Sequence, residues 1–409
     1  MHTTRRTMIA GAAALAASSA RAQQPGITPG IEPGIKIGVL ADFSGIYVDL
    51  MGPGGVACVQ QAVRDFAPGF PVQVVYGDHQ NKADVGSNIV RNWYDAEGVD
   101  MVIGLPNSPT ALAAAVVTRE RDKVCIGAAV TTMEFTGAQC TPNSINWTYD
   151  AYMLAKATGV QTVAAGGKRW YFITVDNSFG ASLQGEMAGF VTGAGGTVLG
   201  NSKYPIGATD YSSLLLAAQA SGADVLCLAL GGTDMVNSLK QAGEFGLRRT
   251  MRIAAPVTLI NDIHALGLPV AQGLLHTNSF YWDTNDRTRA FTRRVLPMMR
   301  GAYPGMAQAG CYAGALHYLK AVASMGVPAA KASGAATVAR MKAMPADDDA
   351  FGPVTIRADG RALVPAFLLR VKTPEESHGP WDYCTIVAEL AGPDAAKPLD
   401  QGGCPLVRA

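Results

Sequence analysis

Short apolar runs alternate with longer amphipathic segments along most of the chain. The first run, residues 35–40, is rich in β-branched side chains, which is typical of a strand inside a parallel sheet covered on both faces. Residues 52–66 follow, and their apolar positions recur at helical spacing. Between them lies the polar and aromatic loop DFSGIY, residues 42–47. Because open α/β sheets bind ligands at the carboxyl ends of their strands, this loop is predicted to form the first wall of a binding site.

The alternation of strand and helix occurs in two consecutive sets. The first set predicts strands at 72–76, 101–103 and 124–128, with helices at 83–97 and 109–121. The pattern breaks at residues 144–152. The second set predicts strands at 170–175, 197–203, 224–230, 251–255 and 273–280, with helices at 179–192, 211–221, 234–245 and near 261–266. Repeated βα units predict parallel sheets, and two similar sets predict two α/β domains, each with its own core.

The last third of the chain has a different pattern. Residues 284–344 are helical without strands, with amphipathic stretches at 287–300, 307–325 and 334–344. Two β-rich runs, 354–357 and 362–371, flank Asp359-Gly360 and predict a hairpin, and 381–390 is a further strand-like run. A late helical block and a late hairpin indicate that the chain returns to both domains. Several crossings then form a hinge with a cleft beside it.

Composition and the N-terminus indicate an exported globular protein. The chain has 409 residues, of which 48% are hydrophobic and 16% charged, and residues 1–22 combine Arg5 and Arg6 with a short apolar run. Ala20-Arg21-Ala22 fits a signal-peptidase site before Gln23, which predicts a signal peptide over 1–22 and a Pro/Gly linker over 23–34. The paired arginines favour the twin-arginine route, but the motif is partial and the general secretory route stays open. The apolar run is shorter than the ~20 residues that span a bilayer, so an uncleaved anchor is disfavoured.

Charge and chemistry exclude several classes of function. Without residues 1–22 the chain has 30 basic and 32 acidic residues and no basic stripe, so no nucleic-acid partner is expected. We find no G-x-S-x-G elbow, no phosphate loop and no histidine spacing for a metal, so no enzyme, cofactor or metal site is predicted. Among seven cysteines, Cys140 and Cys404 lie in loop-like contexts and are the candidate disulfide, although the sequence does not determine the pairing.

Several loops after predicted strands carry small polar residues. Ser108 is interpreted as a helix N-cap before Pro109, and the free N–H groups there can also hold a carboxylate. The backbone after residue 128, with Thr131, is predicted to share that anion. Trp147 and Tyr149 lie where the first set passes to the second, as cleft aromatics or as hinge packing.

With these loops placed, the chain resembles the type I periplasmic solute-binding proteins of the branched-chain amino acid transport class. The resemblance runs from residue 35 to about 407. The stretches that carry it are KIGVLADFSGIY, GLPNSPTALA, IGAAVTTMEFTG, WYFITVDNSFG, DVLCLALGGTDMVNSLKQAGEFG, FYWDTNDRTRAF and IRADGRALVPAFLLRVK. It implies an α/β two-lobed (Venus flytrap) fold with Rossmann-like parallel sheets and three hinge crossings, expected at 147–150, 276–283 and 346–351. Lobe 1 is expected over 35–148 and 283–346, lobe 2 over 149–276 and 351–390, and a C-terminal tail over 391–409.

The resemblance also implies a function. We expect a monomeric periplasmic binding protein, cleaved after Ala22, that delivers a small carboxylate to an inner-membrane ABC permease without inserting into the membrane. A sensor on the same fold is the alternative, and an α/β hydrolase or oxidoreductase is less favoured. The acid that usually binds an amino group should lie near residues 257–259, where this chain has none; Asp234 and Asp262 are the nearest. An amino acid and an aromatic or other organic acid therefore both fit. The candidate ligand-binding residues are Phe43, Ser44, Tyr47, Asn107, Ser108, Ala129, Thr131, Trp147, Tyr149, Phe179, Gly232, Thr233 and Thr258.

Overall fold

The computed structural model describes residues 34–407. Its first sheet has five parallel strands in the order β2-β1-β3-β4-β5. The two faces of this sheet belong to two separate buried clusters, which is why almost every residue of β1 is buried. The strands are β1 (Ile35–Ala41), β2 (Val72–Asp78), β3 (Met101–Gly104), β4 (Val124–Gly127) and β5 (Ser144–Asn146).

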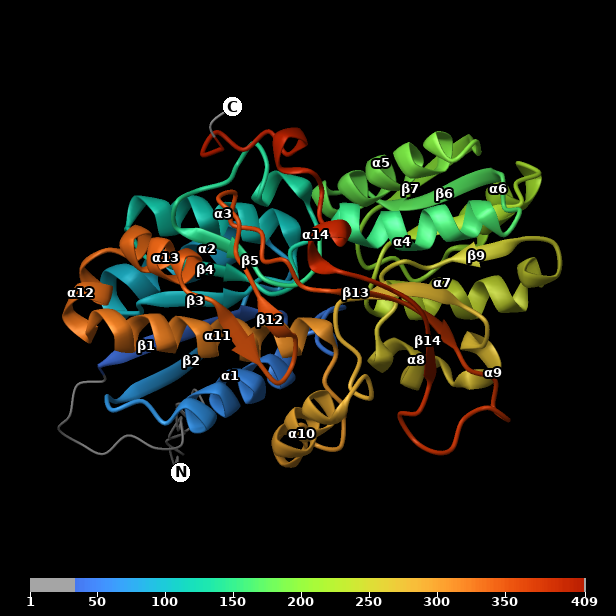
Figure 1. Ribbon diagram of the computed structural model, residues 1–409. Helices are drawn as coiled ribbons and strands as arrows, with labels where there is room; N and C mark the ends of the chain where they lie inside the picture. The colour runs from blue at the N-terminus through green and yellow to red at the C-terminus, as the bar shows by residue number, and fades with distance from the viewer. Residues whose placement is uncertain (1–33, 408–409) are drawn as a thin grey trace, which may run out of the picture. The chain divides into compact units, whose positions relative to one another are not determined.

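Helices from two distant parts of the chain pack on the first sheet. The early helices are α1 (Gly52–Phe66), α2 (Ala83–Asn92) and α3 (Ser108–Glu120). The late helices are α10 (Asp286–Val295), which contacts α1, and α11 (Met306–Met325), α12 (Val327–Ala332) and α13 (Gly334–Ala343), which are drawn in orange in Figure 1. α11 contacts α1 and β3. A Cβ on Gly310 would lie only 2.2 Å from Thr148 Cγ2, so this glycine allows α11 to approach the sheet closely.

The second sheet has seven strands in the order β14-β13-β10-β9-β8-β6-β7. Only β13 is reversed: it runs antiparallel to both of its neighbours, β10 and β14, and all other pairs of strands are parallel. The strands are β6 (Arg169–Val175), β7 (Thr197–Tyr204), β8 (Val225–Ala229), β9 (Arg252–Ala254), β10 (Leu275–Asn278), β13 (Ala366–Val371) and β14 (Cys384–Leu390). The helices of this part are α4 (Ala151–Ala164), α5 (Ser178–Gly193), α6 (Ser212–Ala220), α7 (Thr233–Glu244), α8 (Ile260–Leu266), α9 (Leu268–Ala271) and α14 (Gly392–Ala395).

Two elements lie where the sequence pattern breaks, at residues 144–152. β5 has only three residues, too few for a recognisable alternation. The buried positions of α4 recur at helical spacing, but they include Thr158, Gly159 and Thr162, whereas the apolar Val160 is exposed, so the sequence shows no clear apolar stripe.

The long hairpin predicted at 354–371 is wrong, although its turn is placed correctly. The Gly360 N–H donates to Arg357 O at 3.0 Å, and Ile356 forms one bridge with Ala362. Beyond this turn the two runs separate. β12 (Gly352–Val354) pairs with β11 (Ala346–Asp348), whereas β13 is buried between β10 and β14. Burial in a large sheet outweighs the local pairing.

The chain passes between the two sheets after β5, after β10 and before β13. The structure places the third passage after Arg361, later than the expected 346–351. Arg361 pairs with Asn146 at the end of β5, and β11 contacts α11, so residues 351–361 stay with the first sheet and not the second.

A buried ion pair joins the first and third passages. Arg361 Nε lies 2.8 Å from Asp150 Oδ2, and both side chains are about 2% exposed or less. Arg361 also donates to the carbonyl oxygen of Ala362, and Asp150 caps α4 by accepting the Met153 N–H at 2.8 Å. The first and third passages, which are far apart in the sequence, are therefore held together at one point of the hinge.

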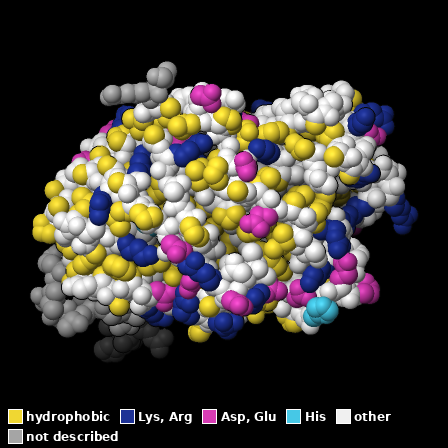
Figure 2. All heavy atoms as spheres, in the orientation of Figure 1, with side chains coloured by type: hydrophobic (Ala, Val, Ile, Leu, Met, Phe, Trp, Pro, Cys, Tyr) yellow, Lys and Arg dark blue, Asp and Glu magenta, His cyan; other side chains and the backbone are white. Residues whose placement is uncertain are grey.

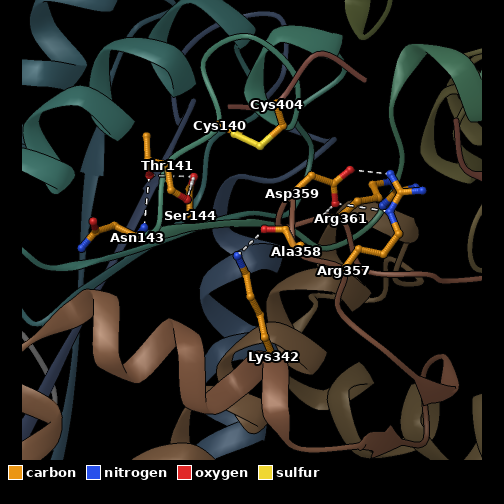
Figure 3. Close-up of a disulfide and its surroundings, with 10 residues drawn as sticks. All are labelled: Cys140, Thr141, Asn143, Ser144, Lys342, Arg357, Ala358, Asp359, Arg361 and Cys404. Carbon is orange, nitrogen blue, oxygen red and sulfur yellow. Dashed lines mark hydrogen bonds and ion pairs between the residues drawn. A yellow bond between two sulfur atoms is a disulfide. The ribbon is translucent and has the colours of Figure 1, made fainter. Parts of the chain in front are cut away.

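Cys140 and Cys404 form a disulfide, with their Cα atoms 5.7 Å apart. Figure 3 shows the disulfide near the loop that carries Arg357, Asp359 and Arg361. The C-terminal segment is thereby tied to the loop between β4 and β5. The other five cysteines are buried free thiols.

None of the helices within residues 34–407 is long and apolar enough to span a membrane. The predicted signal peptide and almost all of the predicted linker lie outside the described residues. On the face in Figure 2, acidic and basic side chains are interspersed.

Candidate ligand-binding site

The Asp42 carboxylate folds the loop that follows β1. It accepts the backbone N–H groups of Ser44 at 3.2 Å, Gly45 at 2.6 Å and Tyr47 at 2.9 Å. These donors satisfy a carboxylate that is fully buried. The resulting turn places Tyr47 in a buried position.

Phe43 and Ser44 turn away from Tyr47 and toward β2. The Phe43 ring lies 5.0 Å from the ring of Tyr76, and Ser44 Oγ donates to Asp78 at 2.6 Å. The structure therefore does not bring these two predicted site residues to the others.

Asn107, and not Ser108, is the N-cap of α3. Its side-chain oxygen accepts the Thr110 N–H at 3.0 Å, and Ser108 is the first helical residue. The Ser108 hydroxyl instead accepts the Thr132 N–H at 3.3 Å. This bond holds the start of α3 against the loop after β4.

Five buried backbone N–H groups in these two loops have no partner. They belong to Asn107, Ser108, Ala129, Val130 and Thr131, and none donates a hydrogen bond to any residue from 34 to 407. More than 90% of buried N–H groups in native proteins are paired. A helix N-terminus leaves its first donors free, and unpaired donors in two adjoining loops, among them those of Ser108, Ala129 and Thr131, suit an anionic acceptor such as a carboxylate.

Trp147 and Tyr149 have different environments although they are two residues apart. The Trp147 ring lies 5.6 Å from the His317 ring of α11 and is fully buried in the first core, so it packs beside the hinge and not at the cleft. Burial raises the pKa of Tyr149, a hydrogen bond with Thr131 opposes this shift, and Asp262 adds to it. Tyr149 therefore lies between the first-sheet donors and the second sheet.

The loops of the two sheets touch directly. Gly232 has φ +65°, and a Cβ there would lie 2.4 Å from Ile46 O and 2.8 Å from Tyr47 Cδ1. The Thr233 N–H donates to Ile46 O at 3.0 Å, and Asn261 Nδ2 donates to Asp49 O at 2.7 Å. Because these loops follow strands of different sheets, the contacts describe a closed arrangement.

Phe179 and Thr258, both from the second sheet, differ in position. Phe179 is buried near Gly231, and its helix α5 contacts the first-sheet loop through Ser182 Oγ, which accepts the Met133 N–H at 2.9 Å. The Thr258 hydroxyl donates to Ala255 O at 2.9 Å and is fully buried within its own loop.

The contacts above connect seven of the thirteen predicted residues around the closed loops, and Ala129 lies in the same loop as Thr131; the seven are Tyr47, Ser108, Thr131, Tyr149, Phe179, Gly232 and Thr233. Asn107 supports this group as a cap. Phe43, Ser44, Trp147 and Thr258 are not connected to it.

Sequence reasoning named Asp234 as one of the nearest acids but missed the two tyrosines that form a polar cluster with it, next to this group. The Asp234 carboxylate accepts the Tyr204 hydroxyl at 3.0 Å and the Gly207 N–H at 3.0 Å, and Tyr211 lies beside Tyr204 with ring centroids 5.2 Å apart. Burial raises the pKa of Asp234, and these hydrogen bonds oppose the shift. The only available signal was an acid in the first turn of a helix that follows Gly231-Gly232. The two tyrosines flank a loop after the edge strand β7, where no pattern marks them.

Asp262 is a second buried acid near the closed loops. Its carboxylate accepts the Leu259 N–H at 2.9 Å. Burial raises the pKa of Asp262 to about 7, the Leu259 N–H opposes the shift, and Asp49 adds to it.

We expect Asp262→Asn to stabilise the ligand-free protein more at pH 8 than at pH 4. The pKa in the unfolded chain is about 3.9, so the folded state favours the protonated acid and the wild type loses stability as the pH rises from about 4 to about 7. Asparagine keeps an acceptor for Leu259 but carries no charge. Urea unfolding at both pH values measures the difference, and an equal gain at both would contradict the expected environment of Asp262.

Within residues 34–407, no group of three or more His, Cys, Asp or Glu side chains is placed to hold a metal ion.

Comparison with known proteins gives matches over most of the chain. A family model described as periplasmic binding protein matches residues 34–378. A periplasmic binding protein from Burkholderia mallei is 40% identical with a TM-score of 0.88, and the match covers 91% of this chain and 99% of that chain. A branched chain amino acid ABC transporter periplasmic ligand-binding protein from Burkholderia xenovorans is 35% identical with a TM-score of 0.80 and the same coverages.

A more distant structure shares the fold. An ABC transporter solute-binding protein from R. palustris, solved in complex with benzoate, is 19% identical with a TM-score of 0.79, covering 87% of this chain and 96% of that chain. A search of curated protein sequences gives no significant match.

Proposed function

Because this chain belongs to the periplasmic binding protein family, we propose that it is the exported solute-binding component of an ABC transporter and closes on a small carboxylate. The observation that carries the proposal is the set of unpaired, buried N–H groups of Ser108, Ala129 and Thr131. A carboxylate between the loops would accept them and remove their desolvation cost.

The mechanism needs binding but no chemical step. A ligand shifts an open form to the closed form because it contacts both sheets only when they are close. Micromolar affinity corresponds to about −8 kcal/mol. Hydrogen bonds to a charged group contribute about 1.5–3 kcal/mol each, so three N–H donors supply a large part of it.

The relatives support a carboxylate without selecting one. The Burkholderia xenovorans protein is named for branched-chain amino acids, and the R. palustris protein was solved with benzoate. A carboxylate is the group that these two ligand types share. For this chain, an amino acid and an aromatic or other organic acid are both candidates.

Export and delivery complete the proposal. The signal peptide would be removed after Ala22, by the twin-arginine or the general secretory route, and the mature monomer would bring its ligand to an inner-membrane permease. No catalysis is part of the proposed role.

A thermal-shift screen tests the function. The mature protein is mixed with amino acids, aromatic acids, short dicarboxylates and the matching uncharged amides. At 100 times Kd a ligand stabilises the folded state by about 2.7 kcal/mol. We expect a carboxylate, and not its amide, to raise the melting temperature; if no acid does so, the proposal is wrong.

Thr131→Val tests the anion site. We expect about tenfold weaker binding of a carboxylate ligand, because the hydroxyl that holds Tyr149 beside the unpaired donors is lost. Calorimetric titration gives the Kd. Thr258→Val is the matched control, since its hydroxyl bonds only within its own loop, and it should leave the Kd unchanged. Equal affinities for wild type and Thr131→Val would remove Thr131 from the site.

A further inference from the structure

The Asp234 carboxylate can accept more hydrogen bonds than the protein itself donates to it. The hydrogen bonds from Tyr204 and Gly207 both go to Oδ2, and the Tyr211 hydroxyl also interacts with the carboxylate. Within residues 34–407, no lysine or arginine forms an ion pair with Asp234, although the residue is only 2% exposed. A buried carboxylate without a cation is costly unless further donors reach it.

The cluster around Asp234 lies where the loops of the two sheets touch. Gly232, two residues before Asp234, packs against Ile46 and Tyr47 of the first sheet. The pKa of Tyr47 is raised by burial, and then by Asp234, Tyr149 and Asp42 in decreasing order. Asp234 and Tyr149 therefore both lie near the Tyr47 hydroxyl, from opposite sheets.

These side chains form a row of polar groups that begins at the anion site. Thr131 bonds Tyr149, Tyr149 neighbours Tyr47, and Tyr47 neighbours Asp234. The Tyr211 hydroxyl interacts with Tyr204 and Asp234, whereas the Tyr47 hydroxyl makes no hydrogen bond to the described part of the chain although its residue is buried. Buried polar groups are normally paired, so the Tyr47 hydroxyl indicates a partner that comes with the ligand.

We propose that Asp234 and Tyr47 bind a hydrogen-bond donor at the end of the ligand opposite its carboxylate. The ligand class is a small acid that carries a hydroxyl or amino group at its far end. This inference rests on the proposed carboxylate-binding function and adds the specificity of its second half. Asp234 would then reject an acid whose far end is apolar, because its carboxylate and the Tyr47 hydroxyl would remain buried without a donor.

Matched pairs of acids test the inference. The Kd is measured by calorimetry for benzoate, 4-hydroxybenzoate and 4-aminobenzoate, and for butanoate, 4-hydroxybutanoate and 4-aminobutanoate. We expect a donor-bearing acid to bind at least about tenfold more tightly than its parent acid, the effect of one hydrogen bond to a charged group. The hydroxyl and amino arms distinguish the two kinds of donor.

Two mild variants assign this preference to residues. Tyr47→Phe removes one hydroxyl, and Asp234→Asn keeps an acceptor but removes the charge. We expect both to reduce the donor-to-parent ratio of affinities, with Asp234→Asn acting most on an amino ligand. Tyr171→Phe is the matched control, because the Tyr171 hydroxyl pairs with Ser202 on the second sheet, and it should preserve the ratio.

The outcomes separate the two proposals. If parent acids bind and their donor-bearing partners bind no more tightly, or if neither variant changes the ratio, the inference is wrong and the carboxylate function stands. If no acid of either series, and none in the wider screen, binds the folded protein, the proposed function is wrong and the inference falls with it. A purely structural role of Asp234 would lower the melting temperature without changing the ratio, which would also overturn the inference.

Discussion

Gly232→Ala is expected to weaken carboxylate binding by about 100-fold while the protein stays folded. The added Cβ would lie 2.4 Å from Ile46 O, which belongs to the other sheet. This clash exists only when the loops of the two sheets touch, so it penalises the closed form. Conformational strain of this kind costs about 1–3 kcal/mol, and 2.7 kcal/mol corresponds to about 100-fold in Kd. Calorimetric titration with a ligand from the screen gives the affinity.

Gly243→Ala is the matched control for this variant. Gly243 lies on the same helix α7, and a Cβ there would meet no atom within 4 Å. We expect wild-type affinity and a small gain in stability, because alanine is the better helix former. Wild-type affinity in Gly232→Ala as well would show that ligand binding does not need the contact between these loops.

Arg361→Met is expected to lower the free energy of unfolding by about 3–5 kcal/mol, the usual cost of removing one partner from a buried ion pair. Asp150 would remain about 2% exposed, without its counter-ion, at the first residue before α4. Arg361 would also lose its bond to Ala362 O, so the first and third passages would no longer be held together. Urea unfolding of the ligand-free protein measures the effect.

Two further variants separate the buried charge from the loss of an arginine. Arg121→Met breaks the Arg121–Asp95 pair, whose side chains are 38% and 45% exposed, and should destabilise the protein much less than Arg361→Met, because water screens an exposed pair. The double variant Arg361→Met/Asp150→Asn should recover part of the loss, because asparagine still caps α4 and leaves no buried charge. A double variant as unstable as the sum of its parts would contradict the ion-pair explanation.

The fold is largely predictable because, within each set of βα units, the spacing of hydrophobic residues changes clearly between strand and helix segments. Strands such as β1 and β8 are short, apolar and flanked by turn residues, and helices such as α11 are long. The failures have physical causes. The buried face of α4 carries threonines and a glycine while its exposed face carries Val160, and β13 pairs within a seven-stranded sheet for which the local sequence has no signal. The third passage was expected too early because the pairing of Arg361 with Asn146 joins residues 215 positions apart.

The candidate site was predictable at the level of loops but not of side-chain directions. The loops after β1, β3 and β4 lie at one edge of the first sheet and those after β6 and β8 at one edge of the second, because parallel strands of a sheet end at the same edge. Within one loop, however, side chains point in different directions. Phe43 packs against Tyr76, whereas Tyr47 is buried and its backbone N–H donates to Asp42. Trp147 and Tyr149 are both buried, but Trp147 packs against His317 of α11, whereas the Tyr149 hydroxyl interacts with Thr131. Such choices depend on hydrogen bonds and packing partners that the local sequence does not contain.

The disulfide between Cys140 and Cys404 has a topological consequence. It closes a covalent ring whose ends are 264 positions apart, and every strand of the second sheet lies inside that ring. A protease that cuts once anywhere within the ring would open it without releasing a fragment. The nicked protein would migrate as one species on a non-reducing gel and as two after a thiol is added.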